Sequence, residues 1–416
     1  MDGHALIKYV NQLHQDRGIP RETIFTAIEA AIQLAAQKYF GEKGPAEDVV
    51  VTIDRDTGTI EAKKGEQPLD PGLLGRIAAQ SAKQLMIQKF REAECEAVFN
   101  VYAARKGDLV KGTIQRFEHG TATVTLADGK SEAILPRSEQ IPGETHHVND
   151  RIDAVILDVK KNGHRVKIIL SRTHPEFVRQ LFEKEIPEIA DRTIEIKAIA
   201  REAGYRTKVA VSSIDMKVDC VGACVGVRGS RIKNIVDALG GERIDIVRWN
   251  DALQVLIPNA LQPANIEEVF LYQRLGRAIV LVQEDQLSLA IGRRGQNVRL
   301  ASKLLGWDIE IMTLDELNQS IERAEGWFSE LPHTTPEIIE AFIEEGFLSY
   351  GDLTCVEAAD LGELAGLPEE QAQDIIDEAD AKDEEIGEEP RAPRGGVDGE
   401  RPARPTAAAR AASLLG

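Results

Sequence analysis

The stretch VGVRGSRI, at residues 225–232, has a counterpart in IGRRGQNV at residues 291–298, 66 positions further along the chain. Each stretch holds two glycines three residues apart, with basic residues between them. The likeness continues beyond the glycines, since Leu239-Gly240 is matched by Leu305-Gly306 at the same offset. A repeated unit of loop, helix, glycine and strand predicts two tandem domains with one binding chemistry.

Glycine pairs of this kind suit the binding of a nucleic-acid backbone. Glycine has no Cβ, so a phosphate can approach the amides at the start of the following helix, and arginine adds charged donors. KH domains clamp about four nucleotides with such a loop. The candidate RNA contacts are Gly226, Val227, Arg228, Gly229, Arg231 and Lys233 in the first copy, and Gly292, Arg293, Arg294, Gly295, Gln296, Asn297 and Arg299 in the second.

Glycine pairs in loops also have two other uses. A single glycine pair often serves only as a tight turn between helices. Glycine-rich loops also bind nucleotides, but neither Gly-x-Gly-x-x-Gly nor Gly-x-x-x-x-Gly-Lys-Ser/Thr occurs in this chain. The duplication, with arginine present in both copies, favours a paired phosphate clamp. Because the second loop has two arginines between its glycines, we expect it to contribute more of the salt-dependent affinity.

A different pattern, of short alternating strands, begins near Gly107. Strands are expected at residues 109–114, 122–126, 132–135, 151–159 and 166–170, which suits a five-stranded barrel of the OB type. Such barrels bind single-stranded nucleic acid. The candidate contacts here are Lys111, Arg116, Phe117, His119 and Arg137. Taken singly, an aromatic residue on a strand more often belongs to the hydrophobic core than to a binding site. An exposed basic residue is likewise more often only solvated.

The N-terminal residues predict a small α+β domain without a catalytic constellation. Two helices are expected between residues 5 and 40, a hairpin at 49–53 and 59–62, and a third helix after Pro71 with Ile77, Leu85, Ile87 and Phe90 along it. No serine in the chain stands in a nucleophile motif such as Gly-x-Ser-x-Gly. We therefore expect a protein that is not an enzyme.

The net charge of -19 is concentrated near the C-terminus. Residues 331–390 hold 19 Asp and Glu and one Lys, whereas residues 101–182 hold 13 basic and 10 acidic residues. The acidic part predicts a helical module, with residues 360–379 resembling a helix-hairpin-helix. Its charge would repel nucleic acid, so either a basic protein partner or a merely solvated module fits it. The Pro-, Arg- and Ala-rich end predicts disorder.

Several function classes receive no support from the composition. No apolar run is long enough to span a membrane, so a cytoplasmic protein without membrane contact is expected. The four cysteines are scattered and no histidine stands at metal-ligand spacing, so we expect no metal, no disulfide and no cofactor. Cys220 and Cys224 lie in an apolar run and are expected to be buried.

Longer strings resemble the NusA family of bacterial transcription elongation factors. They are SRTHP at 171–175, REAG at 201–204, VGACVG at 221–226, GERIDIV at 241–247 and QLSLAIG at 286–292. The resemblance implies a multidomain α+β protein. Its parts are an N-terminal RNA-polymerase-binding domain (1–104), an S1 barrel (105–175), two type II KH domains (183–250 and 251–318), an acidic helix-hairpin-helix-like module (331–382) and a disordered tail (383–416).

The same resemblance implies a function. The N-terminal domain would bind RNA polymerase, while the S1 and KH domains would hold nascent single-stranded RNA. The protein would thereby control pausing, termination and antitermination. Other elongation or antitermination factors would be further partners. A monomer is expected. The residues alone also leave open a KH and S1 factor that acts on ribosomes or in RNA decay. Because His119-Gly120-Thr121-Ala122 stands where the family has an aromatic-rich turn, we expect a weaker contribution from the barrel.

Overall fold

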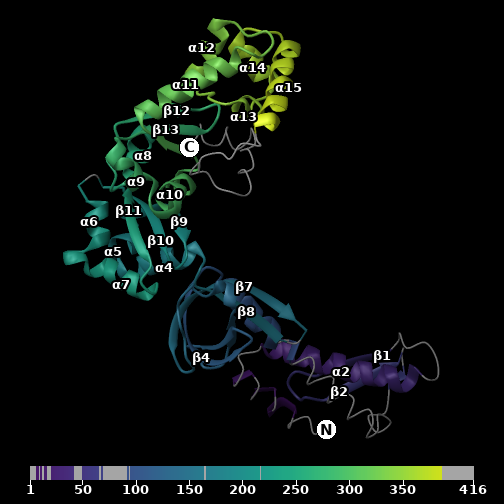
Figure 1. The fold of residues 1–416 in the computed structure, drawn as a ribbon. Helices are drawn as coiled ribbons and strands as arrows, with labels where there is room; N and C mark the ends of the chain where they lie inside the picture. Colours follow the sequence, from purple (N-terminus) through teal and green to yellow (C-terminus); the bar gives the residue numbers. More distant parts are fainter. Residues whose placement is uncertain are drawn as a thin grey trace. The chain divides into compact units, whose positions relative to one another are not determined.

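The computed structural model describes residues 6–8, 10–11, 14–15, 20–41, 49–64, 67–68, 91–92, 94–163, 165–215 and 217–386. The chain divides into two units, one made of residues 1–140 and 144–180, the other of residues 141–143 and 181–416. Figure 1 traces the helices and strands of each. The first unit contains the N-terminal part and a barrel, and the second contains the duplicated domains and the acidic module.

The N-terminal part packs one helix on a small antiparallel sheet. Its elements are α2 (Arg21–Gly41), β1 (Val49–Ile53), β2 (Ile60–Lys64) and β3 (Gln67–Pro68). Helix α2 starts directly after Pro20, and its buried Ile24 and Ile28 pack with Ile53 of the sheet. This confirms the expected helix and hairpin. The helix expected after Pro71 lies outside the described residues.

The barrel of the first unit is closed and has five strands. These are β4 (Leu109–Glu118), β5 (Thr121–Leu126), β6 (Glu132–Leu135), β7 (Arg151–Asn162) and β8 (Arg165–Ser171). They follow the order β4-β5-β6-β8-β7, and β7 pairs back with β4 to close the ring. Alternating side chains such as Val110, Ile114 and Val124 fill the interior. The expected OB-type barrel is confirmed.

Each copy of the repeat folds as a three-stranded sheet with helices. The first copy holds α5 (Pro187–Ala190), β9 (Ile194–Glu202), β10 (Arg206–Ser213), α6 (Cys220–Val225), α7 (Ser230–Ala238) and β11 (Arg243–Arg248), preceded by α4 (Pro175–Glu185). The second holds α8 (Leu253–Leu261), β12 (Glu268–Tyr272), β13 (Arg277–Leu281), α9 (Glu284–Ile291), α10 (Gln296–Leu305) and β14 (Asp308–Met312). In both sheets the first strand pairs antiparallel and the last pairs parallel with the middle strand. This is the type II KH arrangement expected from the sequence.

The two KH domains share one hydrophobic core. Ala200 and Ala210 of the first sheet belong to the same buried cluster as Val280 and Ala301 of the second domain. Helix α10 of the second domain lies against strand β9 of the first. Because burying a common apolar surface stabilises both partners, the two domains fold as one body.

The C-terminal module is a cluster of short helices. They are α11 (Leu314–Phe328), α12 (Pro336–Glu344), α13 (Tyr350–Leu353), α14 (Ala358–Ala365) and α15 (Glu369–Ile386). A capping box between Thr313 and Glu316 starts α11, and Gly366 ends α14 with a φ of 67°. Helices α14 and α15 form the expected helical hairpin. Helix α15 continues to Ile386, beyond residue 382, where the acidic module was expected to end.

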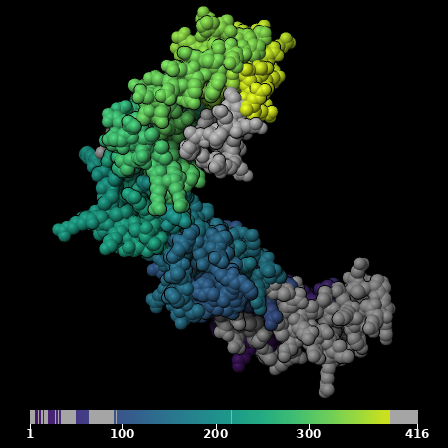
Figure 2. Space-filling view, in the orientation of Figure 1, coloured from purple at the N-terminus to yellow at the C-terminus, as the bar shows by residue number. Residues whose placement is uncertain are grey.

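The acidic module is attached to the second KH domain. Ile279 and Leu281 of β13 cluster with Met312 and Leu317, and Leu348 of the module packs against this group. An ion pair joins Arg277 to Asp352. In Figure 2 the helices of the module continue the surface of the second KH domain without a break. The module is therefore part of the same folded unit as the KH pair.

Candidate nucleic-acid interface

The two glycine loops have nearly the same backbone conformation. The first glycine has φ 74° and ψ 175° in Gly226, and φ 76° and ψ 173° in Gly292. Two residues later the chain enters the left-handed region, with φ 54° at Arg228 and 55° at Arg294. The sequence repeat is thus also a repeat of shape.

The second glycine of each loop borders open space at the start of a helix. Gly229 and Gly295, with φ of 75° and 70°, are the N-caps of α7 and α10. A Cβ added at Gly295 would meet no atom within 4 Å, and one at Gly229 would meet only Ile232 Cγ2 at 3.9 Å. Amides of a first helical turn lack intrahelical partners and attract anions. A phosphate therefore has both room and donors at each loop.

The first glycine has a different task. A Cβ at Gly226 would come within 2.8 Å of Arg231 Cγ, and one at Gly292 within 2.7 Å of Asn297 Cβ. These are distances that real Cβ atoms do not adopt, so the loop can close on the following helix only with glycine. One glycine in each pair serves packing, and the other serves access.

The residues between the glycines extend into solvent. Val227 is 82% exposed, and Arg228, Arg293 and Arg294 are also exposed. Lys233, on α7, is exposed too. Within the described part of the chain, no carboxylate pairs with any of the three arginines. Their guanidinium groups are therefore available to an incoming phosphate.

Two predicted contacts are instead used inside the protein. Arg231 NH1 donates to Glu188 Oε2 at 2.9 Å and to the Ala223 carbonyl at 2.7 Å, which attaches α7 to α5 and α6. Asn297 is 1% exposed, and its Nδ2 donates to the carbonyls of Leu261 and Ala290, each at 3.0 Å. Both side chains hold their loop in place, so we assign them positioning roles.

Two further predicted contacts bind the neighbouring KH domain. Gln296 Nε2 and Arg299 Nε donate to the two carboxylate oxygens of Glu202, each at 2.6 Å. Burial alone would raise the pKa of Glu202, but the hydrogen bonds of Arg299 and Gln296 and the charges of Arg299 and Lys303 lower it overall. Glu202 lies at the end of β9, so it joins the two KH domains. Glu202 was not among the candidate residues, because nothing local in the sequence reveals a partner 94 positions away.

The barrel brings together four of its five candidates. His119 and Gly120, with φ of 49° and 80°, form the turn after β4, and a Cβ at Gly120 would lie 3.2 Å from Arg137 Cδ. Phe117, 38% exposed, and Arg116 precede this turn on β4. Lys111 is exposed near the other end of the strand, opposite Asp153 of β7. At about 3.3 Å per residue, Lys111 is roughly 25 Å along the strand from His119.

Four family models match successive parts of the chain. They are the NusA N-terminal domain at residues 5–67, the S1 RNA binding domain at 103–172, and the NusA-like first and second KH domains at 172–249 and 253–319. Two relatives, each named Transcription termination/antitermination protein NusA, are similar to this chain: that of Halalkalibacterium halodurans is 40% identical and that of Bacillus subtilis is 39% identical. Each match covers 74% of this chain, and 87% and 90% of those proteins. That of Rickettsia conorii is 33% identical, over 92% of this chain and 83% of its own.

The chain belongs to the NusA family.

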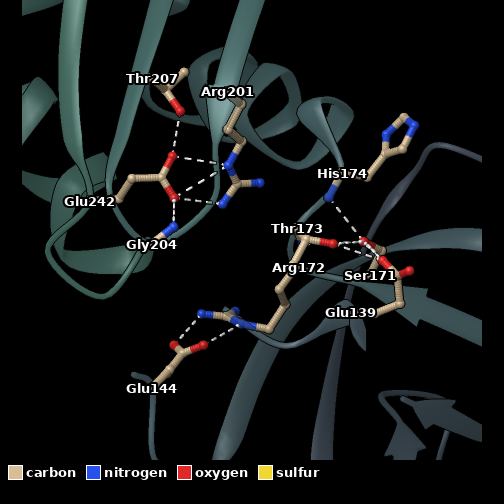
Figure 3. Close-up of polar contacts among 10 residues, drawn as sticks. All are labelled: Glu139, Glu144, Ser171, Arg172, Thr173, His174, Arg201, Gly204, Thr207 and Glu242. Atoms are coloured by element: carbon tan, nitrogen blue, oxygen red, sulfur yellow. Dashed lines mark hydrogen bonds and ion pairs between the residues drawn. The ribbon is translucent and has the colours of Figure 1, made fainter. Parts of the chain in front are cut away.

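The SRTHP string at residues 171–175 of this NusA-family chain forms a partly buried polar network at the exit of the barrel. Ser171 Oγ and Thr173 Oγ1 donate to Glu139 Oε2 at 2.6 and 2.8 Å, and the amide of His174 donates to Ser171 Oγ (Figure 3). Arg172, 4% exposed, donates from Nε to Glu144 at 3.0 Å. This string therefore positions the strand end and the start of α4.

A second network stabilises the hairpin between β9 and β10 in this NusA-family chain. The side chains of Arg201 and Glu242 are 1% and 0% exposed and form an ion pair at 2.8 Å. Glu242 also accepts from the Gly204 amide at 2.8 Å and from the Thr207 hydroxyl (Figure 3). A buried charge is tolerated only when its partners satisfy it in this way.

Other sequence expectations can also be placed. Cys220 and Cys224 are buried, at 3% and 0% exposure, as expected. Among the described helices, none combines the length and apolar character that a bilayer crossing requires.

Proposed function

We propose that this protein is a transcription termination and antitermination factor that holds single-stranded RNA on its paired KH loops while its N-terminal domain binds RNA polymerase. The observation that carries the proposal is the pair of glycine loops. They share one backbone shape, and each presents exposed arginine beside an open helix N-terminus, Arg228 in the first loop and Arg293 and Arg294 in the second. Both loops belong to one folded body, so one RNA strand can be gripped at two points.

The action of such a protein requires no covalent chemistry. Phosphate groups would bind the amides and arginines of each loop, which gives affinity without base specificity. Held at two points, the RNA loses freedom to form a hairpin or to move back into the polymerase. The named relatives are termination/antitermination proteins, and restraint of the RNA hairpin accounts for antitermination. We therefore infer a non-catalytic factor.

The remaining parts follow from the same proposal. We infer the domain boundaries given above, a cytoplasmic monomer, and contacts with nascent RNA and other elongation or antitermination factors. The barrel would add a weaker contact through Arg116, Phe117, His119 and Arg137, because Phe117 is the single Phe, Tyr or Trp among them. Lys111 is too far along β4 to join this group.

The test for the loops compares two substitutions of similar size. Gly229→Asp and Gly295→Asp should weaken binding of an unstructured RNA of about 12 nucleotides, long enough for two loops of about four nucleotides each. Gly229→Asn and Gly295→Asn are the matched controls, because Asn and Asp both tolerate the left-handed backbone and differ in charge. Equal affinities for the Asp and Asn variants would contradict phosphate binding at these glycines.

The arginines allow a second measurement. In single-stranded RNA each phosphate contact contributes about 0.7 to the slope of log affinity against log salt concentration. Arg228→Ala should therefore reduce the slope by about 0.7, and the double change of Arg293 and Arg294 to Ala by up to about 1.4. Slopes unchanged from the wild type would refute the proposal.

The transcription role is tested with the full chain. Affinity capture should retain RNA polymerase in preference to ribosomes, and addition of the protein should change pausing and termination on a template with an intrinsic terminator. The Gly229→Asp/Gly295→Asp variant should keep polymerase binding and lose much of this effect. Capture of ribosomes alone would favour the translation or decay alternative.

A further inference from the structure

An exposed aromatic ring marks the hairpin turn of the first KH domain. Tyr205, in the turn between β9 and β10, is 65% exposed, against 38% for Phe117 of the barrel. Aromatic residues make up only 5% of this chain, and a tyrosine that leaves most of its ring in water gains little from burial. Burial in the first KH domain therefore does not account for an aromatic ring at this position.

The turn that carries Tyr205 is firmly held. The Tyr205 amide donates to the Glu202 carbonyl at 3.0 Å, and the Tyr205 carbonyl accepts from the Arg243 amide at 3.1 Å. Next to it, Gly204 has a φ of 80° and donates to the buried carboxylate of Glu242. The backbone position of the ring is therefore set before any ligand binds, which reduces the entropy cost of a contact.

Glu202 connects this turn directly to the second glycine loop. Its backbone carbonyl binds Tyr205, and its carboxylate binds Gln296 and Arg299 at the start of α10. Gln296 directly follows Gly295, the open glycine of that loop. A single residue of the first KH domain thus lies between the exposed ring and the phosphate clamp of the second domain.

Positive charge accompanies the ring. Arg243 is exposed at the start of β11, beside the turn, and Lys303 is exposed on α10 and close enough for its charge to act on Glu202. An aromatic face with flanking cations is the combination with which proteins bind single-stranded nucleic acid, since every base has a π face and each is followed by a phosphate.

We propose that Tyr205 is a base-stacking residue of a composite RNA site, in which the first KH domain supplies the ring and the second supplies the phosphate clamp. The inference rests on the proposed RNA-binding function. A strand bound at Arg294 and Gly295 places its neighbouring base against Tyr205. Stacking of this kind changes affinity about five- to 150-fold per base and tolerates any base.

The experiment uses the full chain and an unstructured RNA of about 12 nucleotides, in which 2-aminopurine replaces one base at a time, so that the positions span both loops. Stacking on an aromatic ring quenches the fluorescence of this base. Tyr205→Ala should lower affinity at least about fivefold and restore the fluorescence at one position. Tyr205→Phe should retain both properties, because the phenyl ring still stacks.

The matched control is Ile214→Ala. Ile214 is 68% exposed in the same domain but follows the far end of β10, so its removal should leave affinity and quenching unchanged. The slope of log affinity against log salt concentration separates stacking from phosphate contacts. Tyr205→Ala should leave this slope unchanged, whereas loss of Arg294 should reduce it.

The outcomes distinguish the inference from the function beneath it. If loss of Arg294 weakens binding while Tyr205→Ala binds like the wild type, the stacking proposal is refuted and the phosphate clamp stands. If Tyr205→Phe loses as much affinity as Tyr205→Ala, the ring does not stack and the proposal also fails. If neither Arg294 nor Tyr205 affects affinity, the proposed RNA-binding function itself is wrong.

Discussion

The ion pair between Arg277 and Asp352 should control the attachment of the acidic module to the second KH domain. Arg277 NH2 and Asp352 Oδ1 are 2.6 Å apart, with side chains 16% and 7% exposed. The second carboxylate oxygen of Asp352 accepts from the Leu348 amide at 3.0 Å. Substitution of Asp352 by Asn removes the charge and keeps the size, so Arg277 loses its buried partner.

The cost follows from what remains around Arg277. Removing one member of a buried pair typically costs about 3–5 kcal/mol. Asp308 still faces Arg277, at 3.6 Å, but it is 57% exposed and compensates only in part. We therefore expect a loss of about 3 kcal/mol, at the lower end of that range. With a urea dependence of about 1–1.5 kcal/mol per molar, the midpoint for the module should fall by roughly 2–3 M.

A tryptophan in the module provides the readout. Trp327 stacks on Tyr350, with ring centroids 5.6 Å apart. Tyr350 lies two residues before Asp352 in the chain. Replacement of Trp249 and Trp307 by Phe leaves Trp327 as the single tryptophan of the three. Its fluorescence during a urea titration then follows the module and not the KH core.

The control is an exposed pair on the same surface. Arg274 and Glu345 are 3.6 Å apart and their side chains are 36% and 39% exposed, so Glu345→Gln should cost at most about 1 kcal/mol. If Asp352→Asn moves the midpoint no further than Glu345→Gln, the pair is not buried in solution and the reasoning fails. Full recovery in Arg277→Met/Asp352→Leu would show that the unpaired charge causes the loss.

Three other predictions concern Asp352, Lys208 and the first glycine of the second loop. Arg277 holds the pKa of Asp352 below its usual value despite burial. The stability that this carboxylate contributes should therefore be present above about pH 4 and lost as the pH falls further. The urea midpoints of the wild type and of Asp352→Asn should converge at that low pH. Burial lowers the pKa of Lys208 to about 8, so between about pH 8 and 10.4 the unfolded chain binds more protons than the folded chain. The melting temperature of the wild type, relative to that of Lys208→Met, should therefore rise as the pH increases across that window. Gly292→Ala should cost about 1–3 kcal/mol more in thermal melting than Gly295→Ala, since only the former meets a neighbour, at 2.7 Å.

The fold was largely predictable, because its signals are local. Strands of the barrel alternate inward and outward residues between glycine turns, and the KH repeats are visible as two copies of one string. Strand β12 carries no such signal, because Val269, Phe270, Leu271 and Tyr272 are all partly buried and do not alternate. The end of α15 at Ile386 also lay beyond the expected boundary, since acidic residues continue a helix without an apolar signal.

The candidate site was predictable only in part. The exposed loop residues follow from glycine spacing, and Val227, Arg228, Arg293 and Arg294 are exposed in the structure. Arg231, Asn297, Gln296 and Arg299 carry suitable groups, yet their partners are Glu188, the Leu261 and Ala290 carbonyls, and Glu202. Whether a basic or amide side chain faces solvent or another element depends on packing, which spacing does not encode.

The two glycine loops follow from the amino-acid order alone, because glycine at positive φ and arginine between helices are local requirements of the chain. How the two loops relate to each other depends on contacts between distant residues. Strand β9 delivers Glu202 to the start of α10, and a shared core holds both KH domains together. The tertiary fold also links the Tyr205 turn to the start of α10 through Glu202 and attaches the acidic module through Asp352. These are contacts between residues distant in sequence, and only the folded chain brings them together.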